Sequence, residues 1–154
     1  KQLTVEEFFY FLYMVFDKGH LFQFLFHNTA DISAKYPSVG KAFRLQLDAL
    51  ERCIDDLMRN FVKQQQIAAN EHQIGQIVQL IGLVFTQSAN YHGLKGKDMS
   101  HQDQLYQSLS CILFAVMPYI TIEQDKLVQL QQAISAHALA DDLHEQDKTN
   151  SIEA

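Results

Sequence analysis

Apolar and polar residues recur along this chain with the period of an α-helix. Between residues 38 and 65, for example, Leu47, Leu50, Ile54 and Leu57 follow one another at steps of three or four. This spacing places their side chains on one face of a helix. No segment shows the alternation of a half-buried strand. The pattern predicts an all-α fold of about six helices, at residues 4–18, 20–34, 38–65, 71–93, 101–117 and 122–139.

Residues that satisfy free backbone groups mark the ends of these helices. Thr4, Asn70 and Thr121 each stand three residues before a Glu or Gln. In this arrangement each side chain of the pair accepts a hydrogen bond from the backbone N–H of the other residue. The sequence therefore predicts that helices start just after these three residues. Helix-breaking residues predict the stops, at Gly19, Pro37, Gly93, Gly96 and Pro118.

The first two predicted helices carry a high density of aromatic residues. Nine of the nineteen residues from Phe8 to Phe26 are Phe or Tyr, and the chain contains no Trp. Aromatic side chains bury large areas, and a helix that is apolar nearly all round packs inside a larger body or against a ligand or partner. The run predicts either the wall of an apolar cavity or the solid core that would fill it.

A stripe of small residues runs along the fourth predicted helix, where Gly75, Gly82 and Ala89 recur every seven residues. Glycine in a helix interior costs up to about 1 kcal/mol relative to alanine, so this register indicates that another backbone comes close. The fifth helix has a comparable stripe. Together they favour a four-helix bundle made by two subunits, with tight packing inside one chain as the alternative. The predicted dimer interface comprises Gly75, Val78, Gly82, Phe85, Ala89, Ser108, Cys111 and Ala115.

Charge and cysteine usage narrow the possible partners and environment. The formal net charge of −6 argues against a nucleic-acid surface in this chain, since phosphate contacts need clustered Lys and Arg. Much of the acidic excess lies in residues 141–154, which we expect to be a disordered tail after one domain at residues 1–140. Cys53 and Cys111 show no pairing pattern and are predicted to be buried, reduced thiols.

Signals for targeting to a membrane are lacking. Glu6 and Glu7 precede the apolar run from Phe8, at the place where a signal peptide would be basic. No apolar run reaches the roughly 18 residues that a membrane span needs. These features predict a cytoplasmic protein. Because the sequence starts with Lys1 rather than Met, residues upstream of it are expected.

The sequence contains no motif of a catalytic or metal site. Glu-x-x-His pairs, zinc spacings of Cys and His, phosphate-binding loops and the Gly-x-Ser-x-Gly turn do not occur. We therefore expect no enzyme activity, no metal and no cofactor. His20, His27 and His92 are candidates for a polar contact to a molecule bound at the aromatic cluster.

Short segments of the sequence resemble a family of transcription factors. Phe22–Asn28, the Tyr36-Pro37 pair before a long helix, Ile77–Thr86 and the element Met117-Pro-Tyr-Ile-Thr121 follow one another in order. In this order they resemble the C-terminal regulatory domain of one branch of the tetracycline-repressor (TetR) family, over residues 4–133. Family members usually begin with a helix-turn-helix DNA-binding domain, and we expect none within this chain.

The resemblance implies a homodimer whose core is the fourth and fifth helices of each subunit. It also implies an apolar effector pocket among the first four helices, where a small apolar or amphipathic molecule changes DNA affinity through the separate helix-turn-helix domain. By position, the pocket residues expected are Phe9, Tyr13, Phe16, Phe24, His27, Phe61, Phe85 and Tyr91. The function expected is the ligand-binding and dimerisation domain of a regulator, most simply a repressor. A standalone helical interaction module without a ligand is the alternative.

Overall fold

The computed structural model describes residues 3–96 and 99–134, apart from the side chains of residues 23 and 24. The elements in this part of the chain are α1 (Val5–His20), α2 (Gln23–His27), α3 (Thr29–Lys35), α4 (Pro37–Lys63), α5 (Glu71–Leu94), α6 (His101–Val116) and the short 3-10 helix η1 (Met117–Tyr119). The backbone is helical again over residues 124–134, where the described part ends. The predicted all-α class is confirmed.

Reciprocal caps begin α1 and α5 at the predicted places. Thr4 Oγ1 accepts from the Glu7 backbone N–H at 3.2 Å, and the Glu7 carboxylate accepts from the Thr4 N–H at 2.9 Å. Asn70 and Gln73 form the same pair of bonds, at 2.9 and 2.8 Å, at the start of α5. Each pair satisfies two backbone donors that the first turn of a helix leaves without a partner.

The third predicted cap, at Thr121, is wrong. Its hydroxyl donates to the Gln65 carbonyl at 2.6 Å, and its backbone N–H donates to the Gln66 carbonyl at 2.9 Å. These bonds join the segment after η1 to the connection between α4 and α5, where Ile67 and Ile120 form an isolated antiparallel bridge. Since Thr121 is held by this neighbouring loop, the last helix begins only at residue 124.

The second predicted helix, at residues 20–34, is also wrong in its bounds. α1 continues through Gly19 to His20, and the rest divides into α2 and α3 on either side of Asn28. Gly19 is therefore not a stop. A Cβ atom at Gly19 would lie 2.6 Å from Cε2 of Phe85, so glycine at this position allows α1 to approach the Phe85 ring.

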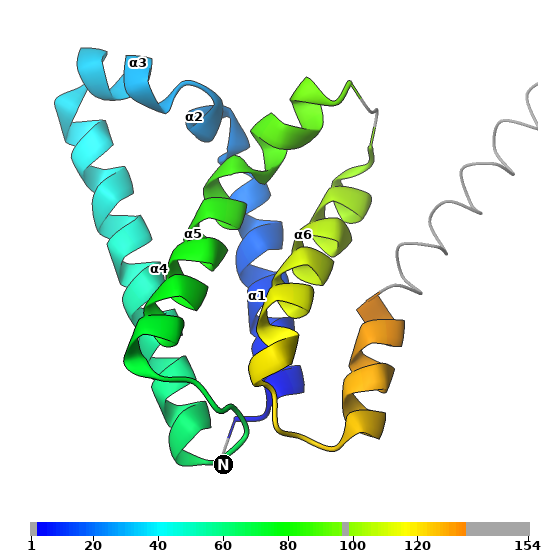
Figure 1. The fold of residues 1–154 in the computed structure, drawn as a ribbon. Helices are drawn as coiled ribbons and strands as arrows, with labels where there is room; N and C mark the ends of the chain where they lie inside the picture. Colours follow the sequence, from blue (N-terminus) through cyan, green and yellow to red (C-terminus); the bar gives the residue numbers. More distant parts are fainter. Residues whose placement is uncertain (1–2, 97–98, 135–154) are drawn as a thin grey trace, which may run out of the picture.

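The long helices form a bundle, and α2 and α3 cross one of its ends (Figure 1). α5 packs against α4 on one side and α6 on the other, while α1 packs against α6. At the other end, Phe8 of α1 meets Phe61 of α4 edge to face, with ring centroids 5.7 Å apart. The core around this pair is made of fully buried side chains from four helices, which include Val5, Leu12, Ile54, Met58, Ile81, Ile112 and Val116.

The aromatic run divides between the interior and the surface. Phe8, Phe9 and Phe16 lie on the buried face of α1, whereas Tyr10 points to solvent with two thirds of its surface exposed. α1 is thus an amphipathic helix and not one that is apolar all round. The N-terminal half of the run supplies part of the solid core, and Phe16 and Phe26 from its C-terminal half lie beside the ring of Phe85.

An ion pair ties the end of α4 to the start of α5. The Arg59 guanidinium donates to Asp55 at 2.7 Å and to both carboxylate oxygens of Glu71 at 2.6 and 2.7 Å. Hydrogen bonds to Asp55 and then to Glu71 raise the pKa of Arg59 above its ordinary value. All three side chains are at the surface, where such pairs contribute little to stability.

The prediction that both cysteines are buried is wrong. Cys53 and Cys111 are both exposed, and both are free thiols. Cys53 lies on the polar face of α4, one residue from the buried Ile54, and Cys111 lies beside the buried Ile112 on α6. Because adjacent helix positions differ by about 100°, a thiol next to a core residue can point outward.

Candidate functional site

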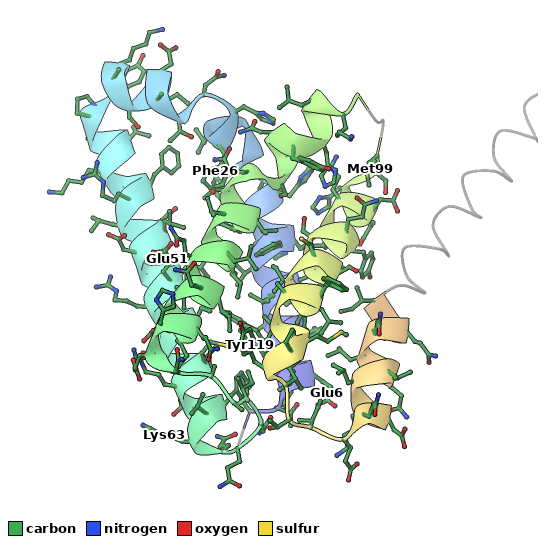
Figure 2. All side chains as sticks on the ribbon, in the orientation of Figure 1. Glu6, Phe26, Glu51, Lys63, Met99 and Tyr119 are labelled. Carbon is green, nitrogen blue, oxygen red and sulfur yellow. The ribbon has the colours of Figure 1, made fainter. Side chains whose placement is uncertain are left out.

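Four helices bring aromatic rings together around Phe85. The ring of Phe85 on α5 lies 5.3 Å from that of Phe16 on α1 and 5.6 Å from that of Phe26 on α2, measured between centroids. Phe26 in turn lies 6.0 Å from Phe43 on α4. We call these four rings the Phe85 cluster. Figure 2 shows Phe26 near the end of the bundle where α2 meets α5.

An apolar pocket opens on the α4 side of the Phe85 cluster, with a volume of about 200 Å³. α1, α2, α4 and α5 all contribute to its wall. It is lined by Val15, Gly19, Phe22, Phe26, Phe43, Gln46, Leu47, Leu50 and Phe85. An apolar cavity of about 150 Å³ is large enough to hold benzene, so this pocket can hold one aromatic ring with a small substituent.

A second, polar pocket of about 30 Å³ lies on the α6 side and shares Gly19, Phe26 and Phe85 with the first. It is formed where the last turns of α1 face the first turns of α6. The remaining lining residues are Phe16, His20, Ser88, His101, Gln104, Leu105 and Ser108. A volume of this size accommodates about one water-sized group.

Two stacked histidines form one side of the polar pocket. The rings of His20 and His101 lie 3.6 Å apart at an angle of 26°. Nε2 of His101 lies 3.0 Å from Oδ1 of Asp17, one turn before the end of α1. Nδ1 of His101 is buried and has no hydrogen-bond partner among the described residues. The pocket therefore has polar side chains in its wall, beside an otherwise apolar site.

Two further polar groups of this pocket already donate to carbonyls of α6 or of the segment just before it. Gln104 donates from Nε2 to the Met99 carbonyl at 3.2 Å, and Ser108 donates from Oγ to the Gln104 carbonyl at 2.8 Å. His101 is a further polar residue of this pocket, and its Nδ1 atom is buried. Its position at the start of α6 follows from the Ser100 cap, whose Oγ accepts from the Asp103 N–H at 3.1 Å.

The structure brings only part of the predicted ligand set together. Phe16 and Phe85 line the site described above. Phe9 and Tyr13 line a different groove of about 390 Å³, with Tyr106 and the residue 124–134 helix. Phe61 lies in the solid core against Phe8. 

The other three predicted residues are not placed at the site. His27 is exposed on α2, and Tyr91 is exposed on the outer side of α5. The side chain of Phe24 lies outside the described residues. His20, a predicted candidate for a polar contact, does line the polar pocket. Helical spacing carried a signal for Gly19, which was missed, since Phe16, Gly19 and His20 share one face of α1. The same holds on α6 for His101, Gln104, Leu105 and Ser108.

An exposed apolar surface runs along the outer sides of α5 and α6. Its members are Leu83, Tyr91 and Leu94 on α5, and Cys111 and Phe114 on α6, and we call it the α5–α6 face. Leu94 is 89% exposed and Phe114 is 74% exposed. A groove of about 380 Å³ separates Leu83 and Tyr91 from Cys111. Exposed large apolar side chains on adjacent helices are typical of interaction sites.

The predicted dimer residues lie on several sides of the two helices. Val78, Gly82 and Ser108 are buried within the chain, and Phe85 belongs to the cluster named after it. Gly82 faces α4, because a Cβ there would lie 2.7 Å from Oε1 of Glu51; Figure 2 shows Glu51 on the side of α4 toward α5.

The rest of that set is more accessible. Gly75 and Cys111 are exposed, and Ala89 and Ala115 are half-buried. Nothing lies within 4 Å of a Cβ built on Gly75. Gly82 of the glycine stripe thus packs against α4 of the same chain, whereas Gly75 has no close neighbour. The predicted subunit interface stays a prediction.

Two further properties concern the described part of the chain. No group of three or more His, Cys, Asp or Glu side chains is arranged there to hold a metal ion. None of the described helices is long and apolar enough to cross a bilayer.

The fold is an all-α bundle with a pocket between its helices and an apolar outer face on two adjacent helices. The family model named TetR, bacterial transcriptional repressor, matches residues 1–128. Because the match covers most of the chain, this protein belongs to the TetR family of bacterial transcriptional repressors, and its role lies in transcription regulation. Comparisons with curated proteins and with solved structures give no match.

Proposed function

We propose that this chain is the effector-binding and dimerisation domain of a TetR-family repressor that senses a small apolar or amphipathic molecule. DNA contact would be made by a helix-turn-helix domain joined to it, since the chain itself has a formal net charge of −6 and no basic cluster in its sequence. The effector would bind at the Phe85 cluster, and two subunits would meet through their α5–α6 faces.

The observation that carries the ligand proposal is the apolar pocket beside Phe85. Side chains from four helices surround about 200 Å³ of space there, while the other end of the bundle is filled by the Phe8–Phe61 core. Interiors of small domains are close-packed, with few voids larger than water. A pocket with mostly apolar and aromatic walls and a polar residue among them, here Gln46, has the usual composition of a small-molecule site.

The exposed α5–α6 face supports the dimer. Leu83, Tyr91, Leu94 and Phe114 would lose apolar surface to water in a bundle made by two copies of α5 and α6. Burial of apolar surface contributes about 25 cal/mol per Å². An isologous interface of this kind uses the same face on both subunits.

One helix would connect the two sites. α5 carries Phe85 on the side toward the pocket and Leu83 on the outer face, two residues away. A ligand that favours one position of α5 relative to α1 and α4 would therefore change the geometry of the subunit pair. DNA affinity would change by the difference in ligand affinity between the two arrangements.

Toluene tests the pocket. We expect it to raise the unfolding temperature in a concentration-dependent way, because a ligand at ten times its dissociation constant stabilises the folded state by about 1.4 kcal/mol. Leu47→Phe, in the pocket wall, is expected to abolish this shift by filling the space. Leu57→Phe on the same helix is the control, since Leu57 packs against the core outside the pocket. Equal shifts in both variants would contradict the site.

Sedimentation equilibrium tests the dimer. At micromolar concentration we expect the full chain to be a dimer and Leu83→Glu to be a monomer, because two buried carboxylates would face each other across the interface. Leu45→Glu on α4 is a matched control, since Leu45 and Leu83 are both 54% exposed. A monomeric wild-type chain that also fails to bind toluene would favour the alternative, a helical interaction module without a ligand.

A further inference from the structure

A groove toward the N-terminal end of α1 differs in composition from the two pockets at the Phe85 cluster. It has a volume of about 390 Å³ and lies between α1, α6 and the residue 124–134 helix. It shares no lining residue with either pocket. We call it the tyrosine groove, because Tyr10, Tyr13 and Tyr106 line it. Its volume is within the range of about 300–1,000 Å³ that small-molecule sites have.

The three tyrosine rings form a row across two helices. Tyr10 and Tyr13 are about one turn apart on α1, and their rings are stacked with centroids 6.4 Å apart at an angle of 13°. The ring of Tyr13 lies 6.0 Å from that of Tyr106 on α6. The buried side chains of Phe9 and Leu109 line the same groove. A ligand in the groove would therefore meet both aromatic rings and aliphatic surface.

A single carboxylate belongs to the lining of the groove. Glu6 precedes Tyr10 by about one helical turn, and Figure 2 shows it at the start of α1 near the residue 124–134 helix. Among the described residues, no hydrogen bond or ion pair involves the Glu6 carboxylate. No Lys, Arg or His lines the groove. Lys126, the one basic residue of the 124–134 helix, pairs with Glu123 at 3.8 Å. The lining therefore carries a net negative charge.

Rings and carboxylate together favour a cation. The face of an aromatic ring is negative and attracts a cation that lies within about 6 Å of its centroid. The carboxylate of Glu6 attracts the same charge and repels an anion. A small hydrated metal ion would gain nothing from Phe9 and Leu109, whereas apolar substituents on an ammonium group would be buried against them.

We infer that the tyrosine groove binds an organic cation, namely a quaternary ammonium group carried on an apolar body. The positive charge lies among Glu6 and the tyrosine rings, and the apolar body lies against Phe9 and Leu109. This site is separate from the proposed effector pocket and does not depend on it.

Three compounds of similar shape test the inference by calorimetric titration of the full chain at pH 7 and low salt. Each has one ring with a tetrahedral substituent: phenyltrimethylammonium is positive, tert-butylbenzene is neutral and benzenesulfonate is negative. We expect the cation to bind about fivefold or more tightly than the neutral compound, because only the cation gains from the rings and from Glu6. The sulfonate is expected to bind least.

Variants of the lining assign the binding to the groove. Glu6→Gln is expected to weaken binding of the cation about fivefold, and Tyr10→Leu about two- to fivefold. Asp48→Asn is the control for charge, since Asp48 is exposed on α4 outside the groove. Tyr36→Leu is the control for the ring, because Tyr36 is 61% exposed and Tyr10 is 67% exposed. Both controls should bind the cation like the wild type.

Leu47→Phe separates this site from the effector pocket, because Leu47 lines that pocket and not the groove. We expect this variant to keep its affinity for phenyltrimethylammonium while it loses toluene binding. Loss of both ligands would place the cation at the Phe85 cluster and overturn the inference. Cation binding without any toluene binding in the wild type would support the groove and count against the proposed effector pocket alone.

The remaining results also decide the question. Tightest binding of the cation that Glu6→Gln and Tyr10→Leu weaken, and that the two controls do not, supports the inference. Equal or tighter binding of tert-butylbenzene or benzenesulfonate overturns the assignment of a cation. Equal losses in Glu6→Gln and Asp48→Asn would show attraction to the net charge of the chain and overturn the site. Lack of cation binding by the full chain overturns it as well.

Discussion

At the scale of single residues, Gly19 sets the position of the Phe85 ring. A Cβ atom at Gly19 would lie 2.6 and 2.9 Å from two ring carbons of Phe85, which is closer than such contacts occur. The glycine also lies in the wall of both pockets. Its small size therefore allows the aromatic ring to lie against α1 and leaves the space on either side open.

Gly19→Ala is expected to weaken toluene binding by about fivefold or more while changing stability by less than about 1 kcal/mol. The added methyl group displaces the Phe85 ring into the pocket, which resembles overpacking, but alanine also favours the helix. Titration and urea unfolding measure the two quantities. Gly93→Ala is the control, since nothing lies within 4 Å of a Cβ there. Equal toluene affinity in wild type and Gly19→Ala would contradict this role.

Substitutions of Phe61 and Phe85 are expected to have different effects on toluene affinity and on stability, although the sequence predicted both as pocket residues. Phe61 is 1% exposed and packs on Phe8, so Phe61→Leu is expected to cost about 1–2 kcal/mol of unfolding free energy with unchanged toluene affinity. Phe85→Leu is expected to alter the affinity and to cost less stability. The reverse result would place Phe61 at the site.

Sequence spacing could predict which face of a helix is buried, but not what that face meets. The sequence predicted that the aromatic run forms a cavity wall or a solid core, and its members Phe8, Phe9 and Phe16 are buried on α1. Whether each of them meets a solid core or a pocket depends on residues far along the chain, such as Phe61 and Phe85. Local patterns contain no information about these distant partners, and five of the eight residues predicted to bind a ligand lie away from the Phe85 cluster.

At the scale of elements, a close contact holds the corner between α3 and α4. A Cβ atom on Gly40 would lie 2.6 Å from Oγ, 2.8 Å from Cβ and 3.2 Å from the backbone Cα of Ser33. The last distance involves backbone, so rotation of the serine side chain cannot relieve it. These two short neighbouring residues allow α3 to fold back on the first turns of α4, beside Phe43 and the apolar pocket.

Gly40→Ala is expected to cost about 1–3 kcal/mol of unfolding free energy in urea, because the methyl group overpacks the α3–α4 corner. Ser33→Gly in the same chain removes the atoms nearest to that methyl group. The double variant is therefore expected to be more stable than the sum of the two single changes predicts, with a coupling of about 0.5–3 kcal/mol. Strict additivity would show that the corner does not pack this closely.

The ends of elements were predictable where the determining residues are neighbours in sequence. The caps at Thr4 and Asn70 need only residues three positions away, and both form. Thr121 has the same local pattern, but the Gln65 carbonyl competes for its hydroxyl from another loop. Gly19 failed as a stop for the same kind of reason, since its environment is set by Phe85.

At the scale of the whole molecule, α5 has different neighbours around its circumference. Gly82 faces Glu51 of α4, Phe85 faces the pocket, and Leu83 points away from the chain. The sequence placed the subunit interface on the glycine line, whereas the exposed apolar surface lies on the Leu83 side. A line of small residues indicates that something packs closely, but it cannot distinguish a helix of the same chain from one of a partner.

Gly75→Ala tests whether the subunit interface lies on the glycine line or on the α5–α6 face. If the dimer forms through the α5–α6 face, we expect the dimer dissociation constant to be unchanged, because Gly75 lies outside that face. The free energy of unfolding should rise by up to about 1 kcal/mol, since a Cβ at this exposed position meets nothing within 4 Å and alanine favours the helix. Analytical ultracentrifugation and urea unfolding measure these values. A dimer that weakens tenfold or more would instead place the glycine line at the interface, because only a close partner backbone would exclude a single methyl group.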